Sequence, residues 1–484
     1  MLMLDMLNNK VLLYIVSRYA IYFIEFLTSM LVAARLGPFY FGVWGSILLL
    51  LNYFQQFHFG IANSVNVLLV HHIREKEKCE KYISNSMLLV MCLSVLVLTI
   101  YVVTTFVDIP LIMKFGINNY LLGVCLIAIL QYYRMLFINI FRVYNRLGYV
   151  VFAQSIVVVL NFVAVLCYDG EALIHWLVWG HLIGNLATLL LALFSDVIPR
   201  FHMENIHRTI QVEIVKKGIM LFLYNSCFYF ILISIRTLIG CQYTVEEFGL
   251  FTFSYTLSNA MLLLLDAVAF VVFPKLISKL SSHNVREVKE VMTGLQRSYV
   301  TSSHLLVYIA ILLFPILLFL LPQYKGAEES FCLISLTILI NMSSFVYSTT
   351  LIARNYERRA ALISIVALVV NGVLGWYLSS IVHIAYIYVI FSTMIAYIVF
   401  TLLTVIAANE ILTKQSIASI LAEAFPLKLL LPFVLCLLVA VLKINYWCYI
   451  IPLVTFLIFN RKDLIYMFTI VETLFQKPEV VDLK

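Results

Sequence analysis

Charged residues are scarce in this chain. Asp, Glu, Lys and Arg make up 12% of its 484 residues, whereas soluble proteins contain about 25%. Hydrophobic residues reach 63%, and the mean hydropathy is +1.02. A protein of this composition would expose more apolar surface than water tolerates, so its solvent must be lipid. The composition excludes a soluble globular protein and predicts an all-α protein that crosses the membrane many times.

Sequence signals for metal, redox or nucleotide chemistry are also missing. The nine cysteines are scattered singly, without a C-x-x-C pair or a Cys/His cluster, so they are best explained as small buried hydrophobic residues and we expect no cofactor. The chain has no G-x-x-x-x-G-K-[ST] loop, which argues against ATP hydrolysis. The longest outer loop, about 108–118, is short for a membrane glycosyltransferase or polysaccharide polymerase. We therefore expect a protein that is not an enzyme.

Long apolar runs follow one another along the chain. Each is long enough to form a transmembrane helix, which needs about 20 residues. We predict about 14 transmembrane helices. They are expected at 11–34, 41–70, 83–107, 119–141, 149–168, 172–195, 218–240, 247–273, 298–321, 329–351, 360–380, 383–408, 426–442 and 445–460.

Positive charges alternate between the two sides of this pattern. Almost every Lys and Arg in a loop lies in the even-numbered loops or near the termini, and only Lys114, Lys325 and Lys443 fall in odd-numbered loops. Because Lys and Arg accumulate on the cytoplasmic side, both termini are predicted to be cytoplasmic. The net charge of +7 thus reflects topology and an affinity for anionic lipid headgroups, and no nucleic-acid partner is expected.

The loops also predict the domain organisation. Residues 1–195 form an N-terminal six-helix bundle and 218–408 a C-terminal one. The segment 196–217 between them looks like a cytoplasmic amphipathic linker that lies along the membrane surface. Residues 409–484 provide a final helix pair and a cytoplasmic tail.

The two halves share a weak repeat. Phe41-Gly42 opens one predicted helix and Asn52 follows ten residues after the glycine, while Phe248-Gly249 opens another and Asn259 follows at the same spacing. Six helices separate the copies, so the repeats are parallel and related by an axis along the membrane normal. Repeats of this kind place the substrate site between the halves.

These residues carry a family likeness. The element Ala34-Arg35-Leu36-Gly37-Pro38, followed by Phe41-Gly42, resembles the signature of bacterial polysaccharide flippases. These flippases belong to the multidrug/oligosaccharidyl-lipid/polysaccharide exporter superfamily. Phe248-Gly249-Leu250-Phe251 and Phe273-Pro274-Lys275-Leu276 are similar to what that family has around its eighth helix. The first element is contracted here, since many members have one more residue between the arginine and the leucine.

The resemblance implies a V-shaped fold of two bundles, like that of MATE transporters, around a central cavity. It implies a flippase of the bacterial cytoplasmic membrane that moves undecaprenyl-diphosphate-linked oligosaccharide repeat units, of the O-antigen, lipopolysaccharide or capsule type, from the inner to the outer leaflet. The cycle would be alternating access, with a possible H⁺ or Na⁺ coupling ion and polysaccharide polymerase machinery as a possible partner.

Ionic residues inside apolar helices need a physical reason, because a charge at the bilayer centre costs roughly 3 kcal/mol or more. On the first helix, Arg18 and Glu25 share one face with Tyr14, Tyr22 and Ser29. Similar polar stripes lie on the second, seventh and eighth helices. Their members are Asn52, Gln56, Asn63 and Asn66; Asn225, Tyr229 and Arg236; and Tyr255, Asn259 and Asp266.

The arginines suit a diphosphate, because the guanidinium group offers a planar fork of donors. We predict that Arg18 and Arg236 bind the diphosphate, with Arg134 as a third candidate. Each arginine also has an alternative role at the membrane surface: Arg18 could extend to the inner surface, Arg236 to the outer surface, and Arg134 could belong to the same basic cluster as Arg142.

The remaining stripe residues would complete the substrate site. Glu25 and Asp266 would be counter-charges of the empty site or would bind a coupling ion or proton. Asn52, Gln56 and Asn259 would hydrogen-bond sugar hydroxyls, although such residues more often join transmembrane helices to one another.

Two rival functions share the predicted fold. A cation-coupled antiporter of drugs or small molecules would also use the acidic pair, but several intramembrane arginines would repel a cationic drug. A flippase of the peptidoglycan precursor is the second rival. The contracted signature and the few arginines in the first, second and eighth helices count against it.

Overall fold

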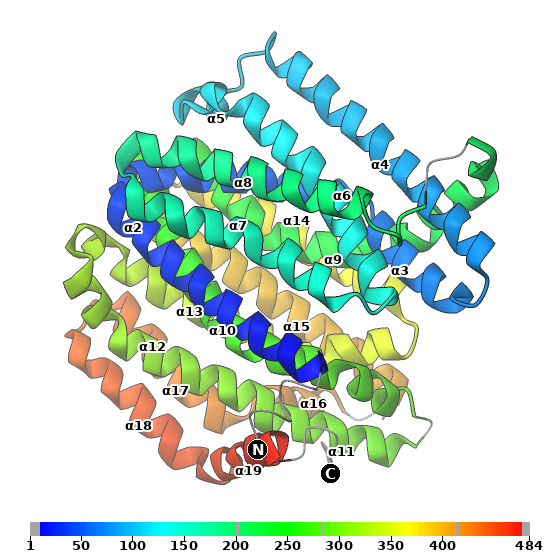
Figure 1. The fold of residues 1–484 in the computed structure, drawn as a ribbon. Coiled ribbons are helices and arrows are strands. Elements are labelled where there is room, and N and C mark those ends of the chain that lie inside the picture. The colour runs from blue at the N-terminus through cyan, green and yellow to red at the C-terminus, as the bar shows by residue number, and fades with distance from the viewer. Residues whose placement is uncertain (1–9, 200–202, 283, 413–415, 477–484) are drawn as a thin grey trace. The chain divides into compact units, whose positions relative to one another are not determined.

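The computed structural model describes residues 10–199, 203–282, 284–412 and 416–476. Within these ranges the regular structure is entirely helical (Figure 1). The α-helices are α2 (Lys10–Gln56), α3 (Ile61–His72), α4 (Lys76–Thr104), α5 (Pro110–Lys114), α6 (Leu121–Val143), α7 (Leu147–Cys167), α8 (Gly170–Leu193), α9 (Arg208–Gln242), α10 (Val245–Leu280), α11 (Val285–Leu295), α12 (Thr301–Leu320), α13 (Glu328–Ala353), α14 (Glu357–Trp376), α15 (Ile390–Leu412), α16 (Ile417–Ala424), α17 (Leu427–Val441), α18 (Ile450–Phe459) and α19 (Arg461–Gln476).

The predicted all-α membrane class is confirmed. In the described ranges, nine helices are long and apolar enough to cross a membrane, or up to ten if the bent pair α16–α17 counts as one span. Two shorter apolar helical segments, Ser226–Gln242 and Tyr446–Phe459, add to them. The count of about 14 spans stays a prediction.

Helix α2 contains two predicted spans joined by a sharp kink. Gly37 adopts φ 65° and ψ 171°, a backbone conformation that only glycine reaches without strain. Pro38 follows at once and begins the second half, where its missing N–H costs nothing. The Ala34–Pro38 element therefore marks the break between the first two spans.

A second break divides the predicted span 41–70. Phe59 and Gly60 have φ values of 47° and 73°, and α3 begins only at Ile61. Gly60 lies against α9, because a Cβ at this position would be 2.4 Å from the backbone oxygen of Gly218. The prediction of one continuous helix was wrong here, since the break depends on a contact with a distant part of the chain.

Packing divides the chain into two compact units. Unit 1 comprises Met1–Ser226 and Tyr243–Gly249, and unit 2 comprises Cys227–Gln242 and Leu250–Lys484. Helix α9 is one continuous helix from Arg208, so the second half of the predicted linker 196–217 is helical. The predicted domain limits were drawn from the loops and their charges, whereas the two units are defined by packing. The two divisions of the chain are therefore separate.

In unit 1, α7 and α8 run side by side and both pack on α2 and α6 (Figure 1). Two glycines of α8 allow this close approach. A Cβ on Gly180 would lie 2.5 Å from Asn161 Oδ1, and one on Gly184 would lie 2.7 Å from Val157 Cγ2. Small residues at such contacts let transmembrane helices pack closely without a hydrophobic driving force.

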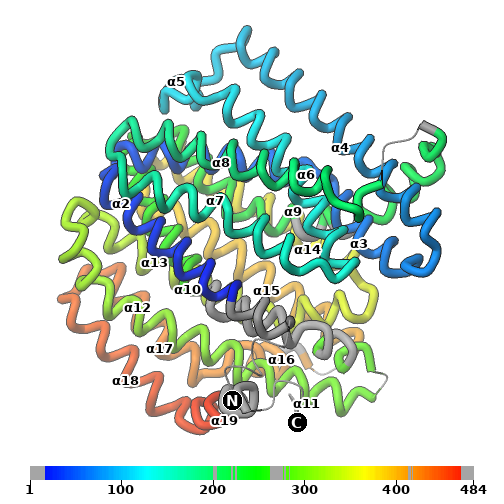
Figure 2. Tube along the Cα trace, viewed as in Figure 1, coloured from blue at the N-terminus to red at the C-terminus, as the bar shows by residue number. Residues whose placement is uncertain are grey.

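Unit 2 is built around α13, which packs against α12, α14, α15 and α17. In the most apolar window of Pro322–Ala353, 89% of residues are buried, compared with 17% in the window of α4. Helix α13 is thus surrounded by protein, whereas α4 keeps most of its apolar surface for lipid. Helices α17 and α18 form an adjacent pair near the carboxyl end, preceded by a 63° bend between α16 and α17 (Figure 2).

Candidate functional site

The predicted diphosphate contact Arg18 is held by its own helix. Arg18 is half-buried on α2, and its Nε donates a hydrogen bond of 2.8 Å to the hydroxyl of Tyr22. The guanidinium carbon also lies 5.0 Å from the centre of the Tyr22 ring, within the range of a cation–π interaction. Tyr22 sits one helical turn after Arg18 and restricts where the guanidinium can point.

Glu25 lies one further turn along α2 and is exposed in the structure. Its carboxylate interacts electrostatically with Arg18 and with Arg134 of α6. The three predicted ionic residues of unit 1 therefore form a loose group, whose charges act on one another through space and not through a direct ion pair. Two of its members are cationic and one is anionic, so the group carries one net positive charge.

Arg134 is directed into unit 1 and not toward Arg142. Its Nη1 lies 3.4 Å from the backbone oxygen of Ala153 on α7, and its Nε is buried without a hydrogen-bond partner. It also interacts electrostatically with His181 of α8. These contacts argue against Arg134 as an extension of the basic cluster.

In unit 2, Arg236 of α9 is only 3% exposed, so it does not extend to a surface. Its guanidinium carbon lies 4.7 Å from the centre of the Tyr255 ring on α10. Asn259, one turn after Tyr255, is half-buried and donates to the Tyr255 backbone oxygen at 2.9 Å. Arg18 and Arg236 thus each lie over a tyrosine ring. The tyrosine belongs to the same helix for Arg18 and to a neighbouring helix for Arg236.

The other predicted site residues have simpler surroundings. Asn52 is half-buried on α2. Gln56 accepts a hydrogen bond of 3.0 Å from the hydroxyl of Ser226 through its Oε1, which matches the helix-joining role left open for these residues. Asp266 lies on α10 in a stretch outside the residues whose side chains are described.

The glycines of the predicted repeat meet in unit 1. A Cβ on Gly42 would lie 2.3 Å from the backbone oxygen of Val245, and one on Gly249 would lie 1.9 Å from that of Pro38. The missing side chain of each glycine thus lets the backbone of the other repeat copy pack closely against it. The motif residues Pro38, Gly42 and Gly249 are brought together by packing, which accounts for the repeat physically.

Sequence reasoning missed the polar centre of unit 2. Asn371, fully buried on α14, hydrogen-bonds residues of α9 and α15. A single Asn in an apolar run was the only available signal. The aromatic partners Tyr22 and Tyr255 were visible as members of the stripes, but not as supports for the arginines.

Metal binding finds no support in the described part of the chain. No group of three or more His, Cys, Asp and Glu side chains there could hold a metal ion. The chemistry that the two arginine groups can perform is binding of an anion with many acceptor oxygens.

Comparison with known proteins adds the family and the fold. The family described as polysaccharide biosynthesis protein matches residues 7–281, more than half of the chain. No curated protein sequence matches the chain.

Among solved structures, the lipid II flippase MurJ in an inward closed conformation is similar, with a TM-score of 0.66, 13% identity, and coverage of 96% of this chain and 99% of that one. An inward-facing multidrug resistance MATE family transporter of the MOP superfamily has a TM-score of 0.63, 12% identity, and coverage of 84% and 98%. A MOP superfamily transporter from Pyrococcus furiosus has a TM-score of 0.56, 12% identity, and coverage of 84% and 95%.

At these identities the structures establish a shared MATE- and MurJ-like fold, whose solved examples are transporters and flippases and not enzymes. The matched family model confirms the likeness found in Ala34–Pro38 and Phe41-Gly42. This multi-pass membrane protein belongs to the polysaccharide biosynthesis protein family.

Proposed function

We propose that this chain is a flippase that moves undecaprenyl-diphosphate-linked oligosaccharide repeat units from the inner to the outer leaflet of the bacterial cytoplasmic membrane. The cycle is alternating access and serves assembly of surface polysaccharide such as O-antigen. Family membership supports the pathway, and the similarity to a lipid II flippase supports a lipid-linked substrate.

The observation that carries the proposal is the pair of arginines inside apolar helices, each held over a tyrosine ring. A guanidinium held against an aromatic ring has a restricted range of orientations, so its donors are partly arranged in advance for the oxygens of a diphosphate. We expect a charge in this position to face a ligand, because facing lipid would cost free energy. Arg134 is the third arginine of the proposed site.

The acidic residues balance these cations. In the proposal, Glu25 offsets Arg18 and Arg134 when no substrate is bound, and the electrostatic influence of both arginines on its carboxylate supports that role. Binding of H⁺ or Na⁺ by Glu25 or Asp266 would weaken this offset and so couple ion binding to substrate binding. Asn52, Gln56 and Asn259 bind sugar hydroxyls, using the hydrogen-bonding atoms that their described contacts leave available.

The topology completes the proposal. Both termini are cytoplasmic, as the alternation of Lys and Arg predicts. The product leaves on the outer face, where polysaccharide polymerase machinery would act on it.

A cation-coupled antiporter is the second candidate, because similar structures include multidrug resistance MATE transporters. The charges of the proposed site favour the flippase. Arg18, Arg134 and Glu25 sum to one net positive charge, which disfavours a cationic drug and favours an anionic lipid headgroup.

The test is a flipping assay in a strain deleted for this gene. Undecaprenyl-linked oligosaccharide should accumulate on the cytoplasmic leaflet, and the wild-type gene should relieve this. Arg18→Ala and Arg236→Ala should each lower flipping at least about tenfold, since a charge-assisted contact contributes roughly 1.5–3 kcal/mol. Arg286→Ala is the control, because Arg286 is 90% exposed, and it should flip like wild type.

The assay separates the candidates. No accumulation in the deletion strain contradicts the flippase and directs the next measurement to drug efflux. Accumulation that all three variants relieve equally supports the substrate and contradicts the arginine site.

A further inference from the structure

Unit 2 contains an apolar cavity of about 340 Å³ between α12, α13, α15 and the α16–α17 bend. Hydrophobic side chains form most of its wall, and His304 and Ser343 are the polar residues among those that line it. Leu402 of α15 and Phe425, Pro426 and Leu429 at the bend also line it. A cavity with so few polar partners does not hold water well, so hydrocarbon is the better occupant.

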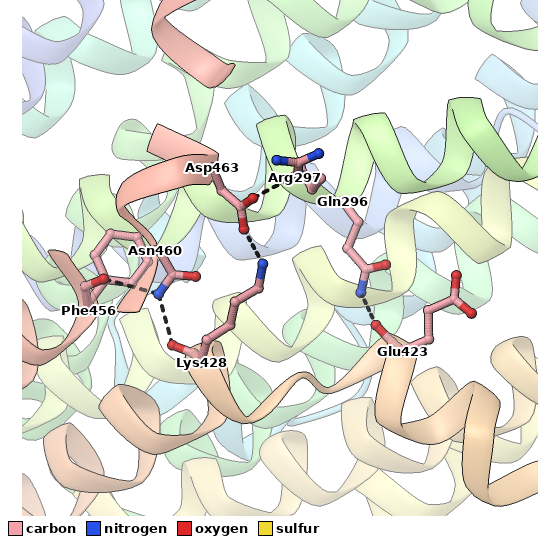
Figure 3. Close-up of polar contacts among 7 residues, drawn as sticks. All are labelled: Gln296, Arg297, Glu423, Lys428, Phe456, Asn460 and Asp463. Atoms are coloured by element: carbon pink, nitrogen blue, oxygen red, sulfur yellow. Dashed lines mark hydrogen bonds and ion pairs between the residues drawn. The ribbon is translucent and has the colours of Figure 1, made fainter. Parts of the chain in front are cut away.

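A basic group borders this cavity. The carboxylate of Asp463, at the start of α19, accepts a hydrogen bond of 2.7 Å from Arg297 Nε, and its second oxygen pairs with Lys428 Nζ (Figure 3). Lys428 belongs to the first turn of α17, between the cavity residues Pro426 and Leu429. Three helical segments therefore meet at one carboxylate.

The neighbouring contacts connect this group to the cavity wall. Gln296, next to Arg297, donates through Nε2 to the backbone oxygens of Glu423 at 2.6 Å and Ala424 at 3.2 Å. Ala424 lines the cavity. Asn460 of the α18–α19 junction donates to the backbone oxygen of Lys428 at 2.8 Å. The position of the basic group relative to the cavity is thus fixed by hydrogen bonds.

The charges of the group are arranged with the positive side outward. The Asp463 side chain is 4% exposed, whereas those of Arg297 and Lys428 are 41% and 38% exposed. One carboxylate cannot neutralise two cations, so one positive charge remains. The nearby Glu423 carboxylate is turned away from the group (Figure 3).

We propose that unit 2 binds one anionic glycerophospholipid, with an acyl chain in the cavity and the phosphate against Arg297 and Lys428. This lipid is a bound component of the protein and not its transported substrate, so the inference goes beyond the proposed function. The predicted topology places Arg297 and Lys428 on the cytoplasmic side, where anionic headgroups attract basic residues. A guanidinium and an ammonium side by side also suit a phosphate oxygen cluster.

The test is lipid binding to the purified full chain, measured by native mass spectrometry after titration with phosphatidylglycerol or phosphatidylcholine of the same chains. The wild type should bind one phosphatidylglycerol with a clear preference over phosphatidylcholine. Lys428→Gln should weaken phosphatidylglycerol binding about fivefold, the effect of one basic residue at a membrane surface, and leave phosphatidylcholine binding unchanged.

Filling the cavity tests the acyl chain. Leu402→Trp should lower binding of phosphatidylglycerol about tenfold, while Leu438→Trp, on an exposed face of α17 that does not line the cavity, should bind like wild type. Ser343→Leu places a smaller obstruction in the same cavity and should give a weaker loss in the same direction. Each variant's thermal unfolding is measured alongside, so that misfolded protein is recognised.

Two results would overturn the inference. One is equal binding of the two phospholipids by the wild type and by Lys428→Gln. The other is displacement of phosphatidylglycerol by undecaprenyl phosphate at equal concentration, which would assign the cavity to a prenyl chain. Neither readout involves flipping, so failure here leaves the proposed function untouched.

Discussion

Two buried asparagines, one in each unit, use their hydrogen-bonding groups in different ways. Asn371 of unit 2 is 0% exposed. Its Nδ2 donates to the Ile231 backbone oxygen at 2.7 Å and the Ser234 hydroxyl at 2.8 Å. Its Oδ1 accepts from Ser392 at 3.1 Å and Thr393 at 3.0 Å. The full hydrogen-bonding capacity of the amide is used.

Asn185 of unit 1 is equally buried, at 0% exposure. Its Nδ2 donates to the His181 backbone oxygen within the same helix at 2.7 Å, but its Oδ1 is buried without a partner. It is not alone in this unit. Further buried atoms without a partner on α6, α7 and α8 are Arg134 Nε, Gln154 Oε1, Asn161 Oδ1 and His181 Nδ1.

The difference shows which polar centre can change its partners. In unit 2 the Asn371 network joins α9, α14 and α15, and a closed network of this kind fixes how helices pack. In unit 1, Arg134 has a buried Nε without a partner, and Gln154, Asn161 and Asn185 on the neighbouring helices each keep a buried oxygen without one. A side chain there can adopt a new hydrogen bond without first breaking an old one, which suits a unit whose charges are proposed to respond to substrate.

The first test concerns the charge in unit 1. Arg134→Met should lower the free energy of unfolding by about 1 kcal/mol, because the exposed Glu25 keeps Arg18 and loses one of its two cationic neighbours. Adding Glu25→Gln to this variant should restore most of the loss, since the carboxylate is then absent. Unfolding in mixed micelles of increasing denaturing detergent measures both.

Arg142→Met is the matched control, because Arg142 is exposed near the end of the same helix, and its effect should stay within about 0.5 kcal/mol. If the double variant is as unstable as Arg134→Met alone, packing of the Arg134 side chain and not its charge explains the loss.

The next effect tests the closed network of unit 2. Asn371→Leu should lower the free energy of unfolding by about 2 kcal/mol, because it leaves buried groups on two neighbouring helices without partners. The same titration measures it. Asn445→Leu provides a control, since Asn445 is exposed and caps only a short 3-10 turn. A loss no larger than that of the control would show that the network contributes little.

Much of the fold follows from local chemistry and was therefore predictable. The apolar runs gave the helices, and Gly37-Pro38 gave the break inside α2, because positive φ and a missing N–H act within a few residues. The break at Phe59-Gly60 was not predictable. It pairs with Gly218, far along the chain, and a phenylalanine carries no signal for positive φ.

In the candidate site, too, contacts within one helix were predictable and contacts between helices were not. The stripe that joins Arg18 and Tyr22 follows from helical spacing alone, and the structure shows their hydrogen bond. The contact between Arg236 and Tyr255 and the interaction between Glu25 and Arg134 join different helices. They depend on how each helix is rotated about its axis, which the hydrophobic pattern of a nearly all-apolar span does not define.

The smallest expected effect belongs to Asn185, and it is the sharpest test of the comparison. Asn185→Leu removes a hydrogen bond to the carbonyl of His181 and also removes a buried oxygen that had no partner. Because the second change offsets the first, the free energy of unfolding should change by no more than about 0.5 kcal/mol. The substitution is the one made at Asn371, in a side chain of equal burial, so the ratio of the two losses isolates the hydrogen-bond network from the effect of size. Equal losses would mean that Asn185 Oδ1 is fully bonded in the membrane, and the two polar centres would then be alike.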